Sequence, residues 1–160
     1  MNQKFGYLET KVNLKKYVTK GYIVSTPTDK EEIARLIRLA ERDISESAEK
    51  CHETDWQFAI AYNAALQLAT IALRASGYRA TTKVGHHWIT FTILPDILGD
   101  KFIKEAYYFN ECRTKRNTTE YCDVGTISQD EAQKLIHEVI AFKKKINSWL
   151  KTHHPTLLGK

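Results

Sequence analysis

Apolar side chains recur at intervals of three and four in a stretch that starts near residue 29, and this spacing places them on one face of an α-helix. Thr28 and Asp29 precede the stretch, and they offer a capping side chain followed by acidic residues in the first turn. The apolar stripe consists of Ile33, Leu36, Ile37, Ala40 and Ile44. The pattern predicts a helix from about residue 29 to about residue 50.

The same periodicity returns near the end of the chain, after a serine that is followed three residues later by a glutamate. Ser128 and Glu131 form this capping-box pattern, in which each side chain accepts a hydrogen bond from the other residue's backbone. The sequence therefore predicts a helix from 129 to 151. Its buried face is expected to carry Ala132, Leu135, Ile136, Val139, Phe142, Ile146 and Trp149 or Leu150.

Residues 56–73 are apolar nearly all the way round and rich in alanine, which is typical of a central helix. Thr54 and Asp55 supply a cap, and Ser76 and Gly77 supply the stop. A membrane-active segment is the alternative. It is disfavoured because the stretch is shorter than a span and carries polar residues, namely Asp55, Gln57, Asn63 and Gln67.

A further helix is predicted to open at Asp100 and to continue to about residue 117. Its inner face would carry Phe102, Ala106, Phe109 and Cys112 or Arg113. The segment before it, 83–95, is rich in β-branched residues and scores as a strand. We favour a helix or a mixed connection, because an isolated strand would lack a partner elsewhere in the chain. Pro95 is expected to end or kink the segment.

Four substantial helices joined by short connections predict an all-α fold, an antiparallel up-and-down four-helix bundle. A short extra helix or irregular segment is expected around 83–98. We expect one domain over 28–152, preceded by a polar lead-in at 1–27 and followed by a loose tail at 153–160.

Composition places the chain among ordinary globular proteins, with 42% apolar and 27% charged residues. The net charge of +5 favours a polyanionic partner, although a solvated basic surface explains it equally well. Three cysteines, without the spacing of a zinc knuckle, are expected to be reduced and structural. The N-terminus lacks a signal-peptide pattern, and no stretch reaches the roughly 18 to 20 apolar residues of a membrane span. We therefore expect a cytoplasmic protein without membrane contact.

The segment 113–121 concentrates cations, an amide, hydroxyls, a carboxylate and a phenol near a helix end. On a continued helix, Arg113, Arg116 or Asn117, and Glu120 would share one face, with Tyr121 turned partly aside. Arginine suits phosphate, because its planar fork donates two parallel hydrogen bonds and stays charged. The simpler alternative is a surface ion pair between Arg116 and Glu120.

A four-helix chain with an arginine and an asparagine near the end of its third long helix resembles the HEPN superfamily of higher eukaryote and prokaryote nucleotide-binding domains. The resemblance covers residues from about 30 to 152. Many members carry an arginine, a polar residue and then a histidine four to six positions after the arginine, and many of those are metal-independent ribonucleases. Here the arginine is Arg116, the polar residue is Asn117, and Tyr121 stands where the histidine is expected.

This resemblance implies an RNA-binding protein or metal-independent endoribonuclease, of the kind that acts as the toxin in toxin–antitoxin or defence systems. A homodimer would bring two motifs into one cleft, and neither a metal nor a cofactor is expected. Arg116 would bind phosphate, Asn117 would orient it, Tyr121 would donate a proton, and Glu120 would act as base. Supporting RNA contacts are expected from Arg113 and Lys115.

Tyrosine in place of histidine favours a rival function, because the pKa of a phenol, near 10, makes it a poor base at neutral pH. In that alternative the protein is a non-catalytic helical partner. It would bind a second protein, such as a nucleotidyltransferase-like subunit, whereas a toxin would have a cognate antitoxin as its partner.

Three other segments contain residue types that could take part in binding or catalysis. His86 and His87 could act as acid and base or as ligands, although adjacent side chains are expected to point in different directions, which disfavours a metal site. Residues 107–109 could stack on bases but are favoured as core, and 143–145 are favoured as a solvated face. His153 and His154 are expected to be solvated.

Overall fold

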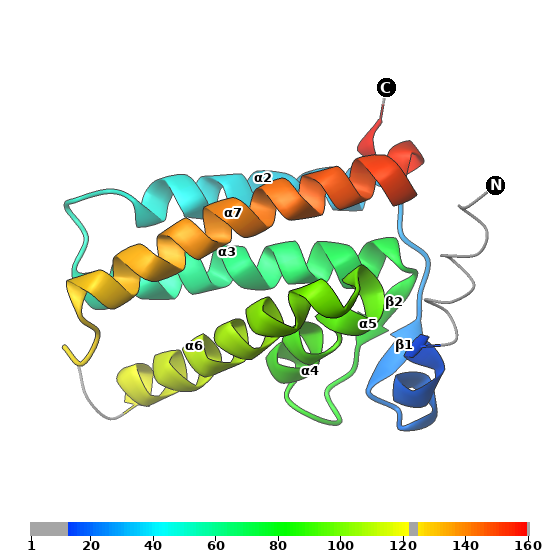
Figure 1. Ribbon diagram of the computed structural model, residues 1–160, viewed down its shortest axis with the longest axis horizontal. Helices are drawn as coiled ribbons and strands as arrows, with labels where there is room; N and C mark the ends of the chain where they lie inside the picture. Colours follow the sequence, from blue (N-terminus) through cyan, green and yellow to red (C-terminus); the bar gives the residue numbers. More distant parts are fainter. Residues whose placement is uncertain (1–12, 122–124, 160) are drawn as a thin grey trace.

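The computed structural model describes residues 13–121 and 125–159, without the side chains of residues 118–121. The described chain is mostly helical and carries a single two-stranded sheet (Figure 1). The prediction of a helical protein is therefore confirmed.

Helix α2 spans Lys30–Ser47 and begins where the capping pattern predicts. The side chain of Asp29 accepts a hydrogen bond from the backbone N–H of Glu32 at 2.8 Å. Ile33 and Ala40, from the predicted stripe, are fully buried. Local capping and apolar spacing thus act together to place this helix.

Helix α3 spans Thr54–Ala75 and is the central helix of the protein. Gly77 follows its cap with a φ of 88°, which a side chain would strain, so the chain turns sharply out of the helix there. The helix is long and apolar enough to cross a membrane, but 67% of its most apolar window is buried inside the protein. This burial fits the core helix of a soluble protein.

Helix α7 spans Gln129–His153 and starts with the predicted capping box between Ser128 and Glu131. Every residue of its predicted apolar face is buried except Trp149, which is half-buried beside the fully buried Leu150. Figure 1 shows α7 running alongside α2 and α3, with all three packed together.

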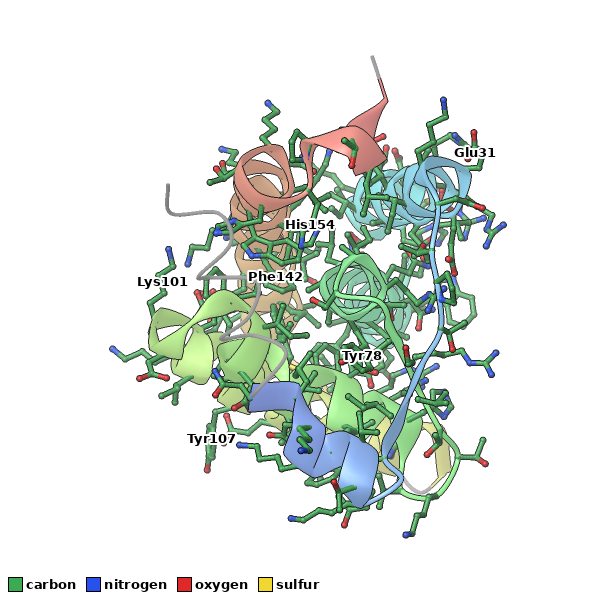
Figure 2. All side chains as sticks on the ribbon, turned by 90° about the vertical axis from the view of Figure 1, so that its right-hand side faces the viewer. Glu31, Tyr78, Lys101, Tyr107, Phe142 and His154 are labelled. Atoms are coloured by element: carbon green, nitrogen blue, oxygen red, sulfur yellow. The ribbon has the colours of Figure 1, made fainter. Side chains whose placement is uncertain are left out.

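Helix α6 spans Ile103–Tyr121 after a short 3-10 turn, η1, at Asp100–Phe102. It contacts α3, α4 and α5. Seen end-on, α3 lies in the middle with the other long helices around it, and Phe142 of α7 is among the side chains of the interior (Figure 2). The predicted inner face is confirmed, since Phe102 of η1 is buried, as are Ala106, Phe109 and Cys112 of α6, while Arg113 is half-exposed.

The segment 83–95 is helical from His86 onward, as favoured, but the expectation that a strand would lack a partner in this chain was wrong. Strand β2, Tyr78–Ala80, pairs antiparallel with strand β1, Ile23–Ser25, which lies in the predicted lead-in. A strand partner therefore does exist in this chain. Helices α4, His86–Thr92, and α5, Leu94–Leu98, follow, and Pro95 sits in the first turn of α5, where the missing N–H costs nothing.

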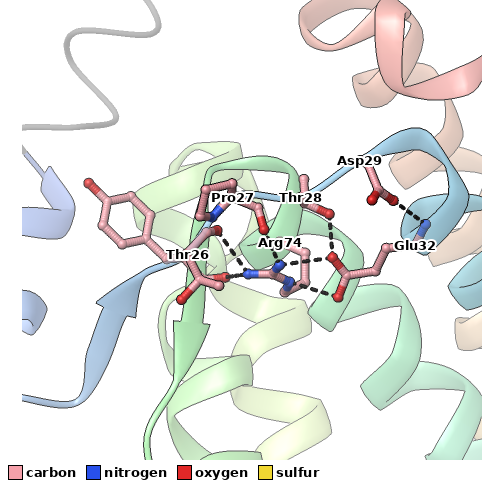
Figure 3. Close-up of polar contacts among 7 residues, drawn as sticks. Thr26, Pro27, Thr28, Asp29, Glu32 and Arg74 are labelled. Atoms are coloured by element: carbon pink, nitrogen blue, oxygen red, sulfur yellow. Dashed lines mark hydrogen bonds and ion pairs between the residues drawn. The ribbon is translucent and has the colours of Figure 1, made fainter.

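Arg74, near the end of α3, forms hydrogen bonds that link this sheet to the start of α2 (Figure 3). Its guanidinium donates to both carboxylate oxygens of Glu32, at 3.0 and 2.8 Å. It also donates to the backbone carbonyls of Thr26, Pro27 and Tyr78. The buried guanidinium thus supplies hydrogen-bond donors for backbone carbonyls in the irregular segment that leads from β1 into α2.

Both ends of the described chain are more ordered than expected. Residues 13–19 are helical, Leu14 is fully buried, and the hydroxyl of Tyr17 donates to Asp96 Oδ2 at 2.7 Å. After α7 a 3-10 helix, Pro155–Leu158, packs against α2 and α7 rather than remaining loose. The apolar Leu157 and Leu158 explain the difference, because they pack against the core.

Candidate functional site

The basic segment of α6 presents Arg116 to the central helix. The guanidinium carbon of Arg116 lies 5.1 Å from the centroid of the Tyr62 ring, and Tyr62 of α3 is fully buried. A guanidinium over an aromatic face is attracted by the negative charge of the ring face. Arg116 is half-buried, so this contact positions the cation at the edge of the core.

The same tyrosine contacts the first turn of α4. The hydroxyl of Tyr62 and Nδ1 of His87 are 3.1 Å apart, within hydrogen-bonding distance, and the centroids of the two rings are 5.9 Å apart. Arg116 and His87 therefore both lie against Tyr62. Sequence reasoning treated the arginine segment and the histidine pair as separate candidates, and the fold brings them together.

His86 and His87 also contact each other, with ring centroids 4.4 Å apart in an edge-to-face arrangement. The expectation that adjacent side chains would point in different directions is wrong here. Both histidines lie in the first turn of α4, and their rings are in contact there. We call the group formed by Tyr62, His86, His87, Arg113 and Arg116 the histidine–arginine cluster.

The cluster holds His87 in its neutral form. Burial, together with the nearby charges of His86, Arg116 and Arg113, lowers the pKa of His87 from 6.5 to about 4. A neutral imidazole has one nitrogen that can accept a proton. At neutral pH, His87 therefore places a proton acceptor beside two permanent cations.

Arg113 is held at the seam between α6 and α4. Its Nε donates to Asn110 Oδ1 at 3.4 Å, and Asn110 Nδ2 donates to Thr92 Oγ1 at 3.1 Å. This chain of hydrogen bonds links the basic face of α6 to the end of α4. The second cation of the cluster is therefore positioned by the fold.

The remaining predicted residues have different surroundings. Lys115 forms an ion pair with Glu131 of α7, so its charge is already partly neutralised within the fold. Asn117 is exposed. Glu120 and Tyr121 lie in the last turn of α6, but their side chains are outside the described residues, and their predicted roles remain predictions.

The other candidate segments contribute less to a site. Within 107–109, Phe109 is fully buried while Tyr107 is 70% exposed, which divides the aromatic run between core and surface. Lys143 and Lys145 form ion pairs with acidic residues of α2 and α6, as a solvated face allows. His154 is half-buried against Trp149 rather than solvated.

Tyr62 is not among the site residues that the sequence predicted. Its signal was available, because a hydroxyl in the middle of an otherwise apolar helix requires a partner when it is buried. Nothing in the linear pattern, however, identifies His87 as that partner. The described residues contain no group of three or more His, Cys, Asp or Glu side chains that could hold a metal ion.

The geometry thus defines a mostly helical protein with a basic, histidine-containing cluster where α3, α4 and α6 meet. No family model matches the chain, and neither a curated protein nor a solved structure matches it.

Proposed function

We propose that this protein binds RNA at the histidine–arginine cluster and cleaves it without a metal ion. The observation that carries the proposal is the shared contact of Arg116 and His87 with Tyr62. It brings a guanidinium, the group suited to binding a phosphate, and a neutral imidazole to the same tyrosine side chain. Metal-independent cleavage of RNA requires these two groups, because the 2′-hydroxyl of RNA supplies the nucleophile.

In the proposed reaction, the ribose 2′-oxygen attacks the adjacent phosphorus and its proton passes to Nε2 of His87. For Nε2 to accept, Nδ1 must carry hydrogen and donate it to the Tyr62 hydroxyl, which the 3.1 Å separation permits. Arg116 and Arg113 stabilise the charge that develops on the phosphate oxygens. The bond to the 5′-oxygen breaks, leaving a 2′,3′-cyclic phosphate and a 5′-hydroxyl.

The departing 5′-oxygen needs a proton, and we assign its delivery to Tyr121. A phenol is protonated at neutral pH and can act as a general acid. In this mechanism His87, rather than Glu120, is the base, while Asn117 and Lys115 contact the RNA chain outside the cluster. The histidine that the motif on α6 lacks is thus replaced by one from α4.

The wider proposal follows the resemblance to the HEPN superfamily. The long helices α2, α3, α6 and α7 would correspond to an antiparallel four-helix bundle of that type. A homodimer would then place two clusters in one cleft, in a cytoplasmic toxin controlled by a cognate antitoxin. Such a homodimer would have two copies of the histidine–arginine cluster facing each other across a two-fold axis.

The test is cleavage of single-stranded RNA by the purified protein in the presence of EDTA. We expect products ending in a cyclic phosphate, and we expect Arg116→Gln and His87→Gln each to lower the cleavage rate by about a hundredfold or more. Arg38→Gln, on the exposed face of α2, is the charge-matched control and should cleave normally. Equal activity of all four proteins would refute the proposed site.

A second candidate function, a non-catalytic helical partner of another protein, is favoured by the outer face of α6. Ile103 and Tyr107 are four residues apart there and are 55% and 70% exposed. Adjacent exposed apolar side chains are common where a protein partner docks. Absence of cleavage by wild-type protein, together with loss of partner binding in a Tyr107→Lys variant, would support this function instead.

A further inference from the structure

A cavity of about 630 Å³ lies beside the histidine–arginine cluster, between the small sheet and helices α3 and α4. Its volume is within the range of roughly 300 to 1,000 Å³ that is usual for small-molecule sites. It is lined by Val24, Thr70, Leu73, Arg74, Arg79, Ala80, Thr81, Thr82, His86 and Thr90. His86 belongs to both the cavity and the cluster, because its ring contacts His87.

The lining combines three kinds of surface. Val24, Leu73 and Ala80 provide apolar walls, and Val24 is 42% exposed although it lies on a strand that borders the core. The threonines provide hydroxyl groups. Thr70, Thr81 and Thr90 each donate the hydroxyl hydrogen to a backbone carbonyl, so their oxygens can only accept hydrogen bonds from a ligand. A small inorganic anion would leave the apolar walls exposed to water.

Two arginines line the cavity, and they have different roles. The guanidinium of Arg74 is committed to Glu32 and to three backbone carbonyls, so it forms a fixed wall (Figure 3). Arg79 on β2 is exposed, and within residues 13–121 and 125–159 its side chain makes no hydrogen bond or ion pair. Arg79 can therefore reach a phosphate at the mouth of the cavity.

From these observations we infer that the cavity binds one nucleoside monophosphate unit, with its base against the apolar walls and its phosphate near Arg79 and His86. The threonine hydroxyl oxygens would accept hydrogen bonds from N–H groups of the base edge and from the ribose hydroxyls. This inference rests on the proposed function in one respect, since it makes the unit a neighbour of the phosphate held by Arg116. The substrate would then be single-stranded RNA, because a paired base cannot turn out into a cavity without unpairing.

A free mononucleotide and a nucleotide within an RNA chain share this chemistry, and the experiment separates them. Backbone amide NMR shifts of the full-length protein would be followed during titration with each of the four nucleoside 3′-monophosphates. Inorganic phosphate, the unphosphorylated nucleosides and a 2′-O-methyl oligoribonucleotide, which cannot be cleaved, would be titrated in parallel. The shifts are expected at residues 79–82 and at Thr90, with at least one mononucleotide binding more tightly than phosphate alone.

Arg79→Gln should weaken mononucleotide binding roughly tenfold or more, the effect of one charged hydrogen bond, while Arg38→Gln should leave it unchanged. The oligoribonucleotide should shift the same amides if RNA is the source. Shifts confined to other elements, equal affinity for phosphate and nucleotides, or an unaffected Arg79→Gln variant would each overturn the inference. Binding of mononucleotides but not of the oligoribonucleotide would overturn the link to RNA.

Failure of this inference can be told apart from failure of the proposed function. If Arg116→Gln abolishes RNA cleavage but Arg79→Gln changes no affinity, the catalytic proposal stands and the cavity assignment is wrong. If mononucleotides bind through Arg79 but cleavage is the same in Arg116→Gln and wild type, the cavity assignment stands and the catalytic one is wrong.

Discussion

The guanidinium of Arg116 lies over the ring of Tyr62, with 5.1 Å between the guanidinium carbon and the ring centroid. Tyr62 in turn lies within hydrogen-bonding distance of His87. One buried ring therefore sets the positions of a cation from α6 and an imidazole from α4. Changes at any of these three residues should alter the stability of the protein, its affinity for RNA or its rate of RNA cleavage.

Replacing Arg116 with glutamine should weaken RNA binding and change its salt dependence. If Arg116 contacts one phosphate, the slope of the logarithm of the binding constant against the logarithm of the salt concentration should become shallower by about one. Loss of the contact with Tyr62 should also lower the unfolding free energy by about 0.5–2 kcal/mol. Fluorescence anisotropy at several salt concentrations and urea unfolding would measure the two effects.

Arg38→Gln is the matched control for both measurements, since it removes one arginine charge from the exposed face of α2. An unchanged salt slope in the Arg116 variant, with intact folding, would mean that Arg116 does not contact a phosphate.

His87 should make the protein sensitive to mild acid. Folding lowers the pKa of His87 from 6.5 to about 4, so between these values the unfolded chain binds a proton that the folded protein does not. The contribution of His87 to the unfolding free energy is therefore constant above about pH 7. It falls as the pH drops from about 6.5 toward about 4. Melting temperatures of wild type and His87→Gln across this range should reveal the difference.

In that comparison the melting temperature of His87→Gln should rise relative to wild type as the pH falls. His137→Gln, which changes an exposed histidine of α7, is the control. Parallel pH curves for wild type and His87→Gln would show that the imidazole is not held neutral by the fold.

Tyr62→Phe keeps the ring beneath Arg116 but removes the hydroxyl that faces His87. We expect RNA affinity to be nearly unchanged and the cleavage rate to fall by about tenfold or more, because the orientation and tautomer of His87 would no longer be fixed. Single-turnover kinetics separate the two quantities. Phe91→Leu, a change in a buried ring next to Tyr62, controls for packing alone. A matching loss of rate in both variants would point to packing rather than to the hydroxyl.

The pair of Arg74 and Glu32 should contribute strongly to stability. The side chain of Arg74 is only 7% exposed, and replacing it with methionine would leave a carboxylate and three carbonyl oxygens without their donor. We expect a loss of about 3–5 kcal/mol in unfolding free energy. Lys143→Met, which breaks the more exposed pair with Glu41, should cost less than about 1 kcal/mol. Similar losses in the two variants would contradict the special role of the buried pair.

The Arg74 guanidinium also lowers the pKa of Glu32 below 4.5. The stability from this interaction is thus present above about pH 4.5 and is lost as the pH falls below it. Glu32→Gln should remove that acid sensitivity, and chemical unfolding between pH 3 and pH 6 would test it, roughly spanning the relevant range.

The sequence by itself determined the long helices. The capping residues Asp29 and Ser128, the apolar spacing and the stop at Gly77 are local signals, and each acts within a turn or two of the helix that it bounds. These interactions need no knowledge of the rest of the chain. The helices were predictable for this reason, and so was the buried face of α7.

Only the tertiary structure decided the pairing of β1 with β2 and the composition of the site. A three-residue strand has too little pattern to identify a partner more than fifty residues away, so neither strand was predicted from sequence. The meeting of Arg116, Tyr62 and His87 likewise depends on how α6 and α4 pack on α3. Packing of this kind follows from the shapes of many side chains at once, and no spacing along the chain records it.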